Sequence, residues 1–162
     1  MTGMASTTSA SVEHYLSTVY EPEMDYVDGE LEDRNVGEKD HSKLQAKLIR
    51  LLPAGLAVFP EVRIRVAANR FRVPDVCVYA EEPAEQVFTS PPLVVVEILS
   101  PEDRMARMQR KLEDYYAMGC RHVWVLDPCA KKAYRYDGTA VTEVRGGLTA
   151  GDLTLSLEGL FG

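Results

Sequence analysis

The sequence has no apolar run near the ~20 residues that a membrane-spanning helix needs, although 46% of its 162 residues are hydrophobic. It also has no signal-peptide pattern, because Arg34 is the first basic residue and no apolar block precedes it. We therefore expect a cytoplasmic protein with no membrane partner.

Cysteine is scarce: the three cysteines, Cys77, Cys120 and Cys129, have neither a CxxC spacing nor the Cys/His spacing of a zinc site. An odd number in a chain expected to stay in the cytoplasm indicates reduced thiols. We interpret Cys77 as a small core residue rather than a nucleophile. A glycine-rich phosphate-binding loop, an internal repeat and an interdomain linker are also missing.

Positive charge is in deficit: 18 basic residues face 25 acidic ones, a net charge of −7, which argues mildly against a nucleic-acid partner. The basic residues nevertheless gather in three stretches, at 63–72, 104–111 and 131–135. Each stretch could meet a phosphate backbone through a local basic face. A solvated surface is an equally weighted alternative.

The length predicts one domain at residues 12–162, preceded by a disordered Ser/Thr/Ala-rich tail at residues 1–11. Alternation, turn and capping signals predict a mixed sheet with helices, an α/β fold. The expected elements are a hairpin across Asp28-Gly29, a helix at 40–52, strands at 56–66, 70–79 and 93–99, a helix from Ser100 to Gly119, a strand at 122–126 and further C-terminal strands.

Two acids lie at the ends of strands that we expect to be buried neighbours. The strand at 93–99 is apolar at both parities, which is typical of a central strand, and it carries Glu97 near its end. Asp75 shares the parity of the apolar residues Val73 and Cys77. A buried carboxylate is costly unless it is paired or holds a cation. The pair therefore predicts a divalent metal site, with the carbonyl of Ile98 as a third oxygen ligand for Mg²⁺.

Three further residues bear on this site. Lys111 borders the apolar stripe of its helix, so its amine could point at the sheet and assist an attacking water or a phosphate; a snorkelling surface lysine is the alternative. Glu30, just after the hairpin turn, is a candidate to complete the shell or position the water. We interpret His41, at the start of its helix, as an exposed or capping residue rather than a catalytic one.

The order of these motifs resembles the Uma-two family, which is assigned to the restriction-endonuclease-like PD-(D/E)xK nuclease superfamily. The resemblance covers about residue 21 to the C-terminus and implies a metal-dependent phosphodiesterase with an αβββαβ core. The residues that carry it are Asp28-Gly29-Glu30, Pro74-Asp75, PPLVVVEILSP at 91–101, Lys111, Tyr115, Gly119 and WVLDP at 124–128.

The resemblance also implies roles for individual residues. Asp75 matches the motif aspartate and Glu97 the second acid. Leu99 stands where the superfamily has its lysine, and Lys111 matches the lysine that this family uses instead. Glu30 matches an acid near the N-terminal hairpin.

The sequence thus leads to the hypothesis of a Mg²⁺- or Mn²⁺-dependent endonuclease that cuts DNA by water attack on a phosphodiester. A homodimer is expected, because duplex cleavage often uses two sites related by a two-fold axis. The alternative is a catalytically weak or inactive module that binds nucleic acid or a partner protein, favoured by Leu99 and the acidic net charge. An RNA substrate also stays open.

Overall fold

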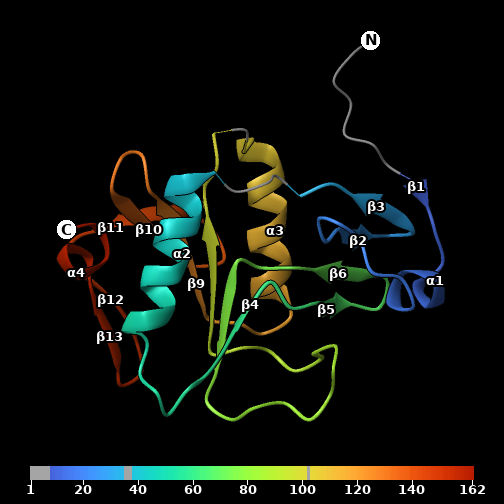
Figure 1. Ribbon diagram of the computed structural model, residues 1–162, viewed down its shortest axis with the longest axis horizontal. Helices are drawn as coiled ribbons and strands as arrows, with labels where there is room; N and C mark the ends of the chain where they lie inside the picture. Colours follow the sequence, from blue (N-terminus) through green and yellow to red (C-terminus); the bar gives the residue numbers. More distant parts are fainter. Residues whose placement is uncertain (1–7, 35–37, 102) are drawn as a thin grey trace.

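A computed structural model describes residues 8–34, 38–101 and 103–162. Its centre is a six-stranded sheet in the order β11-β10-β9-β8-β7-β4 (Figure 1). Strands β8 and β9 are parallel and the other neighbours are antiparallel, so the predicted mixed sheet is confirmed. The strands are β4 (Ala57–Pro60), β7 (Val76–Tyr79), β8 (Val94–Ile98), β9 (His122–Asp127), β10 (Lys132–Tyr136) and β11 (Val141–Val144).

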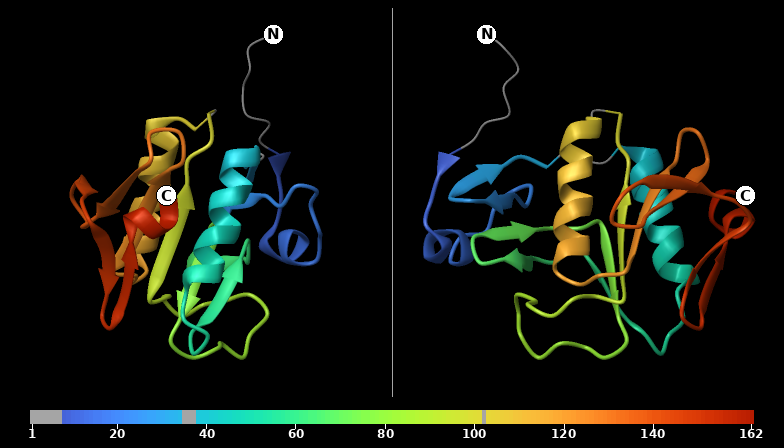
Figure 2. Two further views of the ribbon diagram at one scale, coloured as in Figure 1. Left: turned by 60° about the vertical axis from the view of Figure 1, so that its left-hand side comes forward. Right: turned by 180° about the vertical axis from the view of Figure 1, so that it is seen from behind.

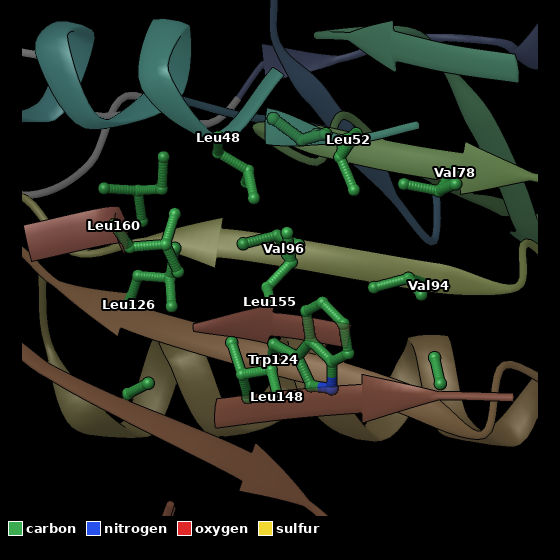
Figure 3. Packing of buried hydrophobic residues seen from close by; sticks show 14 of the residues in the cluster. Leu48, Leu52, Val78, Val94, Val96, Trp124, Leu126, Leu148, Leu155 and Leu160 are labelled. Carbon is green, nitrogen blue, oxygen red and sulfur yellow. The ribbon is translucent and has the colours of Figure 1, made fainter. Parts of the chain in front are cut away.

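Helix α2 (Lys39–Leu51), the hairpin β12 (Gly147–Ala150) and β13 (Leu153–Ser156), and helix α4 (Leu157–Phe161) cover one face of this sheet. The leucines of α2 recur at helical spacing and pack on alternate residues of the central strands, as Figure 3 shows. Buried residues of this core include Leu48, Val78, Val96, Trp124 and Leu155. The helix predicted at 40–52 is confirmed to within one residue at each end.

Helix α3 (Met105–Ala117) covers the opposite face, and Figure 2 shows the six-stranded sheet between α2 and α3. It connects the parallel strands β8 and β9. Its stripe Met108, Leu112 and Tyr115 is buried against the strand residues of the other parity, Val95 among them. Glu97 has the parity of Val95, so its side chain belongs to the face that α3 covers.

A second, five-stranded sheet carries the N-terminal hairpin, in the order β1-β3-β2-β6-β5. The predicted hairpin across Asp28-Gly29 is present, since β2 and β3 are paired. The predicted disorder up to residue 11 is wrong for Thr8 and Ser9, which pair with β3, whereas residues 1–7 lie outside the described residues. The elements are β1 (Thr8–Ser9), α1 (Val12–Leu16), β2 (Asp25–Val27), β3 (Glu30–Glu32), β5 (Ile64–Ala67) and β6 (Arg70–Arg72).

The two long strands predicted at 56–66 and 70–79 are each divided between the two sheets. β4 pairs with β7 in one sheet, and β5 pairs with β6 in the other. The break falls where Pro74 has no N–H to give and Glu61 has a left-handed φ of 52°. The Glu61 N–H donates to the Pro74 carbonyl at 3.2 Å, which ties the two bends together.

The helix predicted to begin at Ser100 begins at Met105 instead. Ser100 does not cap it: its N–H donates to Asp103 Oδ2 at 2.7 Å, and its carbonyl accepts from the Asp103 N–H at 3.0 Å. Ser100 and Asp103, which in the sequence looked like the start of a helix, instead form a turn that precedes the helix. None of the helices in the described residues is long and apolar enough to cross a membrane.

Candidate active site

Asp75 and Glu97 meet at the end of the antiparallel pair β7 and β8. The register places Val76 opposite Val96, so the next residues along are Asp75 and Glu97. The Asp75 N–H donates to Glu97 Oε1 at 3.2 Å, and the Ile98 N–H donates to Asp75 Oδ2 at 2.7 Å. Both residues are buried, with 6% and 3% of their surface exposed. The structure therefore brings the two predicted acids together.

Lys111 reaches Glu97 from α3. Its Nζ lies 3.7 Å from Glu97 Oε2, and its side chain is 12% exposed. One helical turn further along, Tyr115 donates its hydroxyl to Glu97 Oε1 at 3.4 Å. The face of α3 that packs on the sheet thus places an ammonium and a hydroxyl on one carboxylate.

Two cationic or ionisable side chains that the sequence did not assign to the site contact Asp75. His41 Nε2 lies 3.3 Å and Arg34 Nη2 lies 3.4 Å from Asp75 Oδ1. The interpretation of His41 as an exposed or capping residue is wrong, because it is only 9% exposed. Its spacing of three and seven residues from the buried Leu44 and Leu48 is the signal that places it on the inner face of α2.

Burial and charge shift the pKa values of the groups around the pair. Burial raises the pKa of Glu97 to about 7, against the opposing effect of Lys111. Burial lowers the pKa of Lys111, but the charges of Glu97, Asp25 and Asp75 together outweigh this effect and the net shift of the pKa is upward. Desolvation also lowers the pKa of His41, but the hydrogen bond to Asp75 and the charges of Asp75 and Glu97 together outweigh that effect, so the pKa is raised.

A small cavity of about 20 Å³ opens onto these groups, with room for about one water molecule. The Oγ atom of Ser100 is buried in its wall and has no hydrogen-bond partner among the described residues. A buried hydroxyl without a partner is uncommon and indicates that a polar ligand belongs there. The lining residues are Arg34, His41, Asp75, Glu97, Ile98, Ser100, Asp103 and Lys111.

The donor set fits a hard divalent cation. The described residues contain no group of three His, Cys, Asp or Glu side chains arranged as a metal site. Two carboxylates with backbone oxygen and water suit Mg²⁺, which keeps several of its waters, better than they suit zinc. Asp75 and Glu97 are the residues that could hold it. Ile98 lines the cavity, and the contribution of its carbonyl stays a prediction.

Glu30 does not line the cavity at Asp75 and Glu97, so the prediction that it supports this site is wrong. It is exposed on β3, opposite Val27 and Ser9. The end of the hairpin nearer Asp75 carries Asp25 and Glu32 instead, because Asp25 Oδ1 accepts from the Val73 N–H at 3.1 Å. Glu30 therefore lies two residues too far along its strand.

Comparison with known structures supports the fold. A crystal structure from Anabaena variabilis ATCC 29413, described as "a putative nuclease belonging to DUF820", matches with a TM-score of 0.75 and 20% identity. The match covers 94% of this chain and 97% of the other. At this identity the likeness concerns the fold. A search of curated protein sequences gave no match.

The model of one protein family matches residues 12–160, nearly the whole of the described domain. The family is described as "Putative restriction endonuclease". The predicted resemblance is thereby confirmed, and with it the nuclease-like α/β fold. The chain belongs to the Uma2 family of restriction-endonuclease-like proteins.

Proposed function

We propose that this protein is a metal-dependent endonuclease that hydrolyses phosphodiester bonds in DNA. The observation that supports it best is the group formed by Asp75, Glu97 and Lys111, in which two buried carboxylates lie side by side with an ammonium 3.7 Å from one of them. A purely structural ion pair needs one acid and one base. Here two acids are buried side by side, each with its own cationic neighbour, next to a cavity with an unpartnered hydroxyl.

Asp75 and Glu97 would hold the cation, with the Ile98 carbonyl as a further oxygen. A divalent cation in such a site acidifies a water and offsets the charge that builds on a phosphate. Burial disfavours the charged form of Glu97, so a bound cation also relieves the cost of keeping this carboxylate ionised.

The chain's own side chains orient these carboxylates and supply positive charge. Tyr115 holds Glu97 Oε1, and the Ile98 N–H holds Asp75 Oδ2, so neither carboxylate turns freely. The Lys111 ammonium is placed to stabilise charge on a phosphate oxygen, the role that the displaced motif lysine would have had at Leu99. Arg34 adds a second fixed cation on the opposite side, at Asp75 Oδ1.

The test is cleavage of supercoiled plasmid with Mg²⁺ by the wild type, Asp75→Asn and Glu97→Gln. We expect nicking and linearisation by the wild type only, and none in EDTA. Glu30→Gln is the matched control, because it makes the same acid-to-amide change at an exposed position. Equal cleavage by the wild type and Asp75→Asn, after repeated purification, would reject the proposal.

A second candidate function is an inactive nuclease-fold module that binds nucleic acid or a protein. One observation favours it: Arg34 and His41 already contact Asp75 Oδ1, so protein cations neutralise the carboxylate that a metal would use. Calorimetry with MnCl₂ separates the two candidates. Asp75-dependent binding of Mn²⁺ supports the enzyme, whereas DNA binding in EDTA with no heat from Mn²⁺ supports the module.

A further inference from the structure

Three lysines converge on a cavity of about 480 Å³ that is not part of the candidate active site. Lys43 and Lys47 come from α2, and Lys131 comes from the turn between β9 and β10. Asp40 is the one acidic side chain among the lining residues and Gly162 adds its main-chain carboxylate, so the three lysines still leave the local charge positive on a chain whose net charge is −7. The floor is apolar and partly aromatic, with Leu44, Pro128, Leu160 and Phe161.

Local geometry explains why these lysines face one another. Lys43 and Lys47 are four residues apart, so they lie on the same side of α2. The turn that carries Lys131 is shaped by Asp127, whose Oδ1 accepts the N–H groups of Cys129 and Ala130 at 3.0 Å each. Lys131 itself has a left-handed φ of 54°, which ends the turn.

Two of the three ammonium groups are free to bind a ligand. Lys47 donates to the Gly162 carbonyl at 2.7 Å. Lys43 and Lys131 are exposed, and neither forms an ion pair or hydrogen bond with its side chain among the described residues. Their neighbour Lys132 differs, because its Nζ lies 3.8 Å from Glu143 on the adjacent strand.

A third cavity, of about 340 Å³, lies between the lysine cavity and the candidate active site and shares lining residues with each. It shares Asp40, Pro128 and Cys129 with the lysine cavity. It shares His41 and Ser100 with the cavity at Asp75 and Glu97. The three cavities therefore adjoin one another in a row past the N-terminal end of α2, and we call this row the path.

We propose that this path holds the substrate strand and that Lys43 and Lys131 bind a backbone phosphate next to the one that is cleaved. The proposal rests on the nuclease function proposed above and identifies where the substrate extends from it. Lysine ammonium groups around an aromatic-floored groove suit a nucleic-acid backbone with its bases.

The connecting cavity suits a nucleoside rather than a phosphate. Its carboxylates, from Glu38, Asp40 and Asp127, repel phosphate, whereas they accept hydrogen bonds from base amino groups. Leu99 and Pro101 add apolar wall against which a sugar or base packs. The cavity at Asp75 and Glu97 would thus hold the cleaved phosphate, the connecting cavity a nucleoside, and the lysine cavity the next phosphate.

The experiment compares Lys131→Gln with Lys132→Gln, adjacent substitutions that remove the same charge. Binding of a fluorescein-labelled DNA duplex is measured by anisotropy over a series of salt concentrations in EDTA, which prevents metal-dependent cleavage. We expect Lys131→Gln to raise Kd roughly 3- to 10-fold at low salt and to lower the slope of log K against log salt by about 0.9, the loss of one phosphate contact. Lys132→Gln keeps the wild-type Kd and slope, and Lys43→Gln behaves like Lys131→Gln.

The outcomes distinguish this proposal from the nuclease function. If the wild type binds and cleaves DNA but Lys131→Gln and Lys132→Gln have the same Kd and slope, the lysine site is overturned and the nuclease function stands. If the wild type binds no DNA at low salt, the lysine site is overturned, and the nuclease function is overturned as well only if the wild type also fails to cleave plasmid with Mg²⁺. Labelled poly-glutamate that binds as tightly as DNA and depends on Lys131 would assign the cavity to an acidic protein and overturn the nucleic-acid assignment.

Discussion

Replacing Arg72 with methionine should destabilise the whole domain, because Arg72 connects the five-stranded sheet to α3. Arg72 is 2% exposed on β6. Its guanidinium donates to Asp114 Oδ2 on α3 at 2.8 Å, to Asp25 Oδ2 on β2 at 3.1 Å and to Glu32 Oε1 on β3 at 3.1 Å. Methionine fills much of the same volume, so the change removes the charge and its hydrogen bonds more than it removes packing.

The expected loss of unfolding free energy depends on which hydrogen-bond donors each acid keeps when Arg72 is replaced. Removing one partner of a buried ion pair typically costs about 3–5 kcal/mol, because a charge is left uncompensated. Asp114 keeps Arg70 at 2.9 Å, and Asp25 keeps the Val73 N–H at 3.1 Å. We therefore expect the lower end, about 3 kcal/mol. For a domain of this size that lowers Tm by roughly 6–12 °C.

Urea unfolding followed by tryptophan fluorescence measures the loss, with the single Trp124 in the core as the probe. Lys132→Ala is the control, since its exposed pair with Glu143 contributes at most about 1 kcal/mol. Adding Asp25→Asn to Arg72→Met removes one uncompensated charge, so the two changes together should cost less than their sum. Strict additivity, or an unchanged midpoint for Arg72→Met, would show that the network does not hold the two parts together.

Three further predictions concern the core and the site. Leu48→Ala, fully buried on α2, should cost about 2–5 kcal/mol in urea unfolding, whereas Leu51→Ala, 43% exposed, should cost much less. Lys111→Met should reduce the plasmid-cleavage rate by about 10²–10³, and the exposed Arg110→Met on the same helix should leave it near wild type. Titration with Mn²⁺ should give a binding heat for the wild type and none for Glu97→Gln; a heat retained by Glu97→Gln would place the cation elsewhere.

The sheet and its helices are predictable from the sequence because their buried faces require apolar residues at regular spacing. The run of apolar residues at 93–99 predicts a strand covered on both faces, and β8 is buried at every position. The leucine spacing of α2 predicts its inner face in the same way. The division of two long strands between two sheets was not predicted, because the apolar residues continue past Pro60 and Pro74 and these two prolines were the one sequence signal of the break.

The acids of the site were predictable and most of their partners were not. Asp75 and Glu97 stand out as charges on apolar strands, which is an unusual position for any carboxylate. Arg34 approaches from a connection, where charged residues are ordinary and nothing local marks it, whereas His41 is marked only by its helical spacing from Leu44 and Leu48. Glu30 was misplaced because a turn signal fixes a hairpin but does not show which of its acids lies near the next sheet.

Lys111 brings its ammonium to Glu97 from the helix that covers the sheet, although the residue two positions after Glu97 on the strand is Leu99. Leu99 has the parity of Glu97 and lies just beyond the end of β8, where its side chain is partly buried against the core beneath α3. Lys111 enters from α3 above the same face and reaches Glu97 at 3.7 Å, with its aliphatic stem buried at the helix–sheet interface. A lysine on the strand and a lysine on the covering helix can thus serve one carboxylate, provided that the helix is held rigidly. Arg72 supplies that rigidity through Asp114, three residues after Lys111, so the buried ionic network and the candidate active site depend on the same helix.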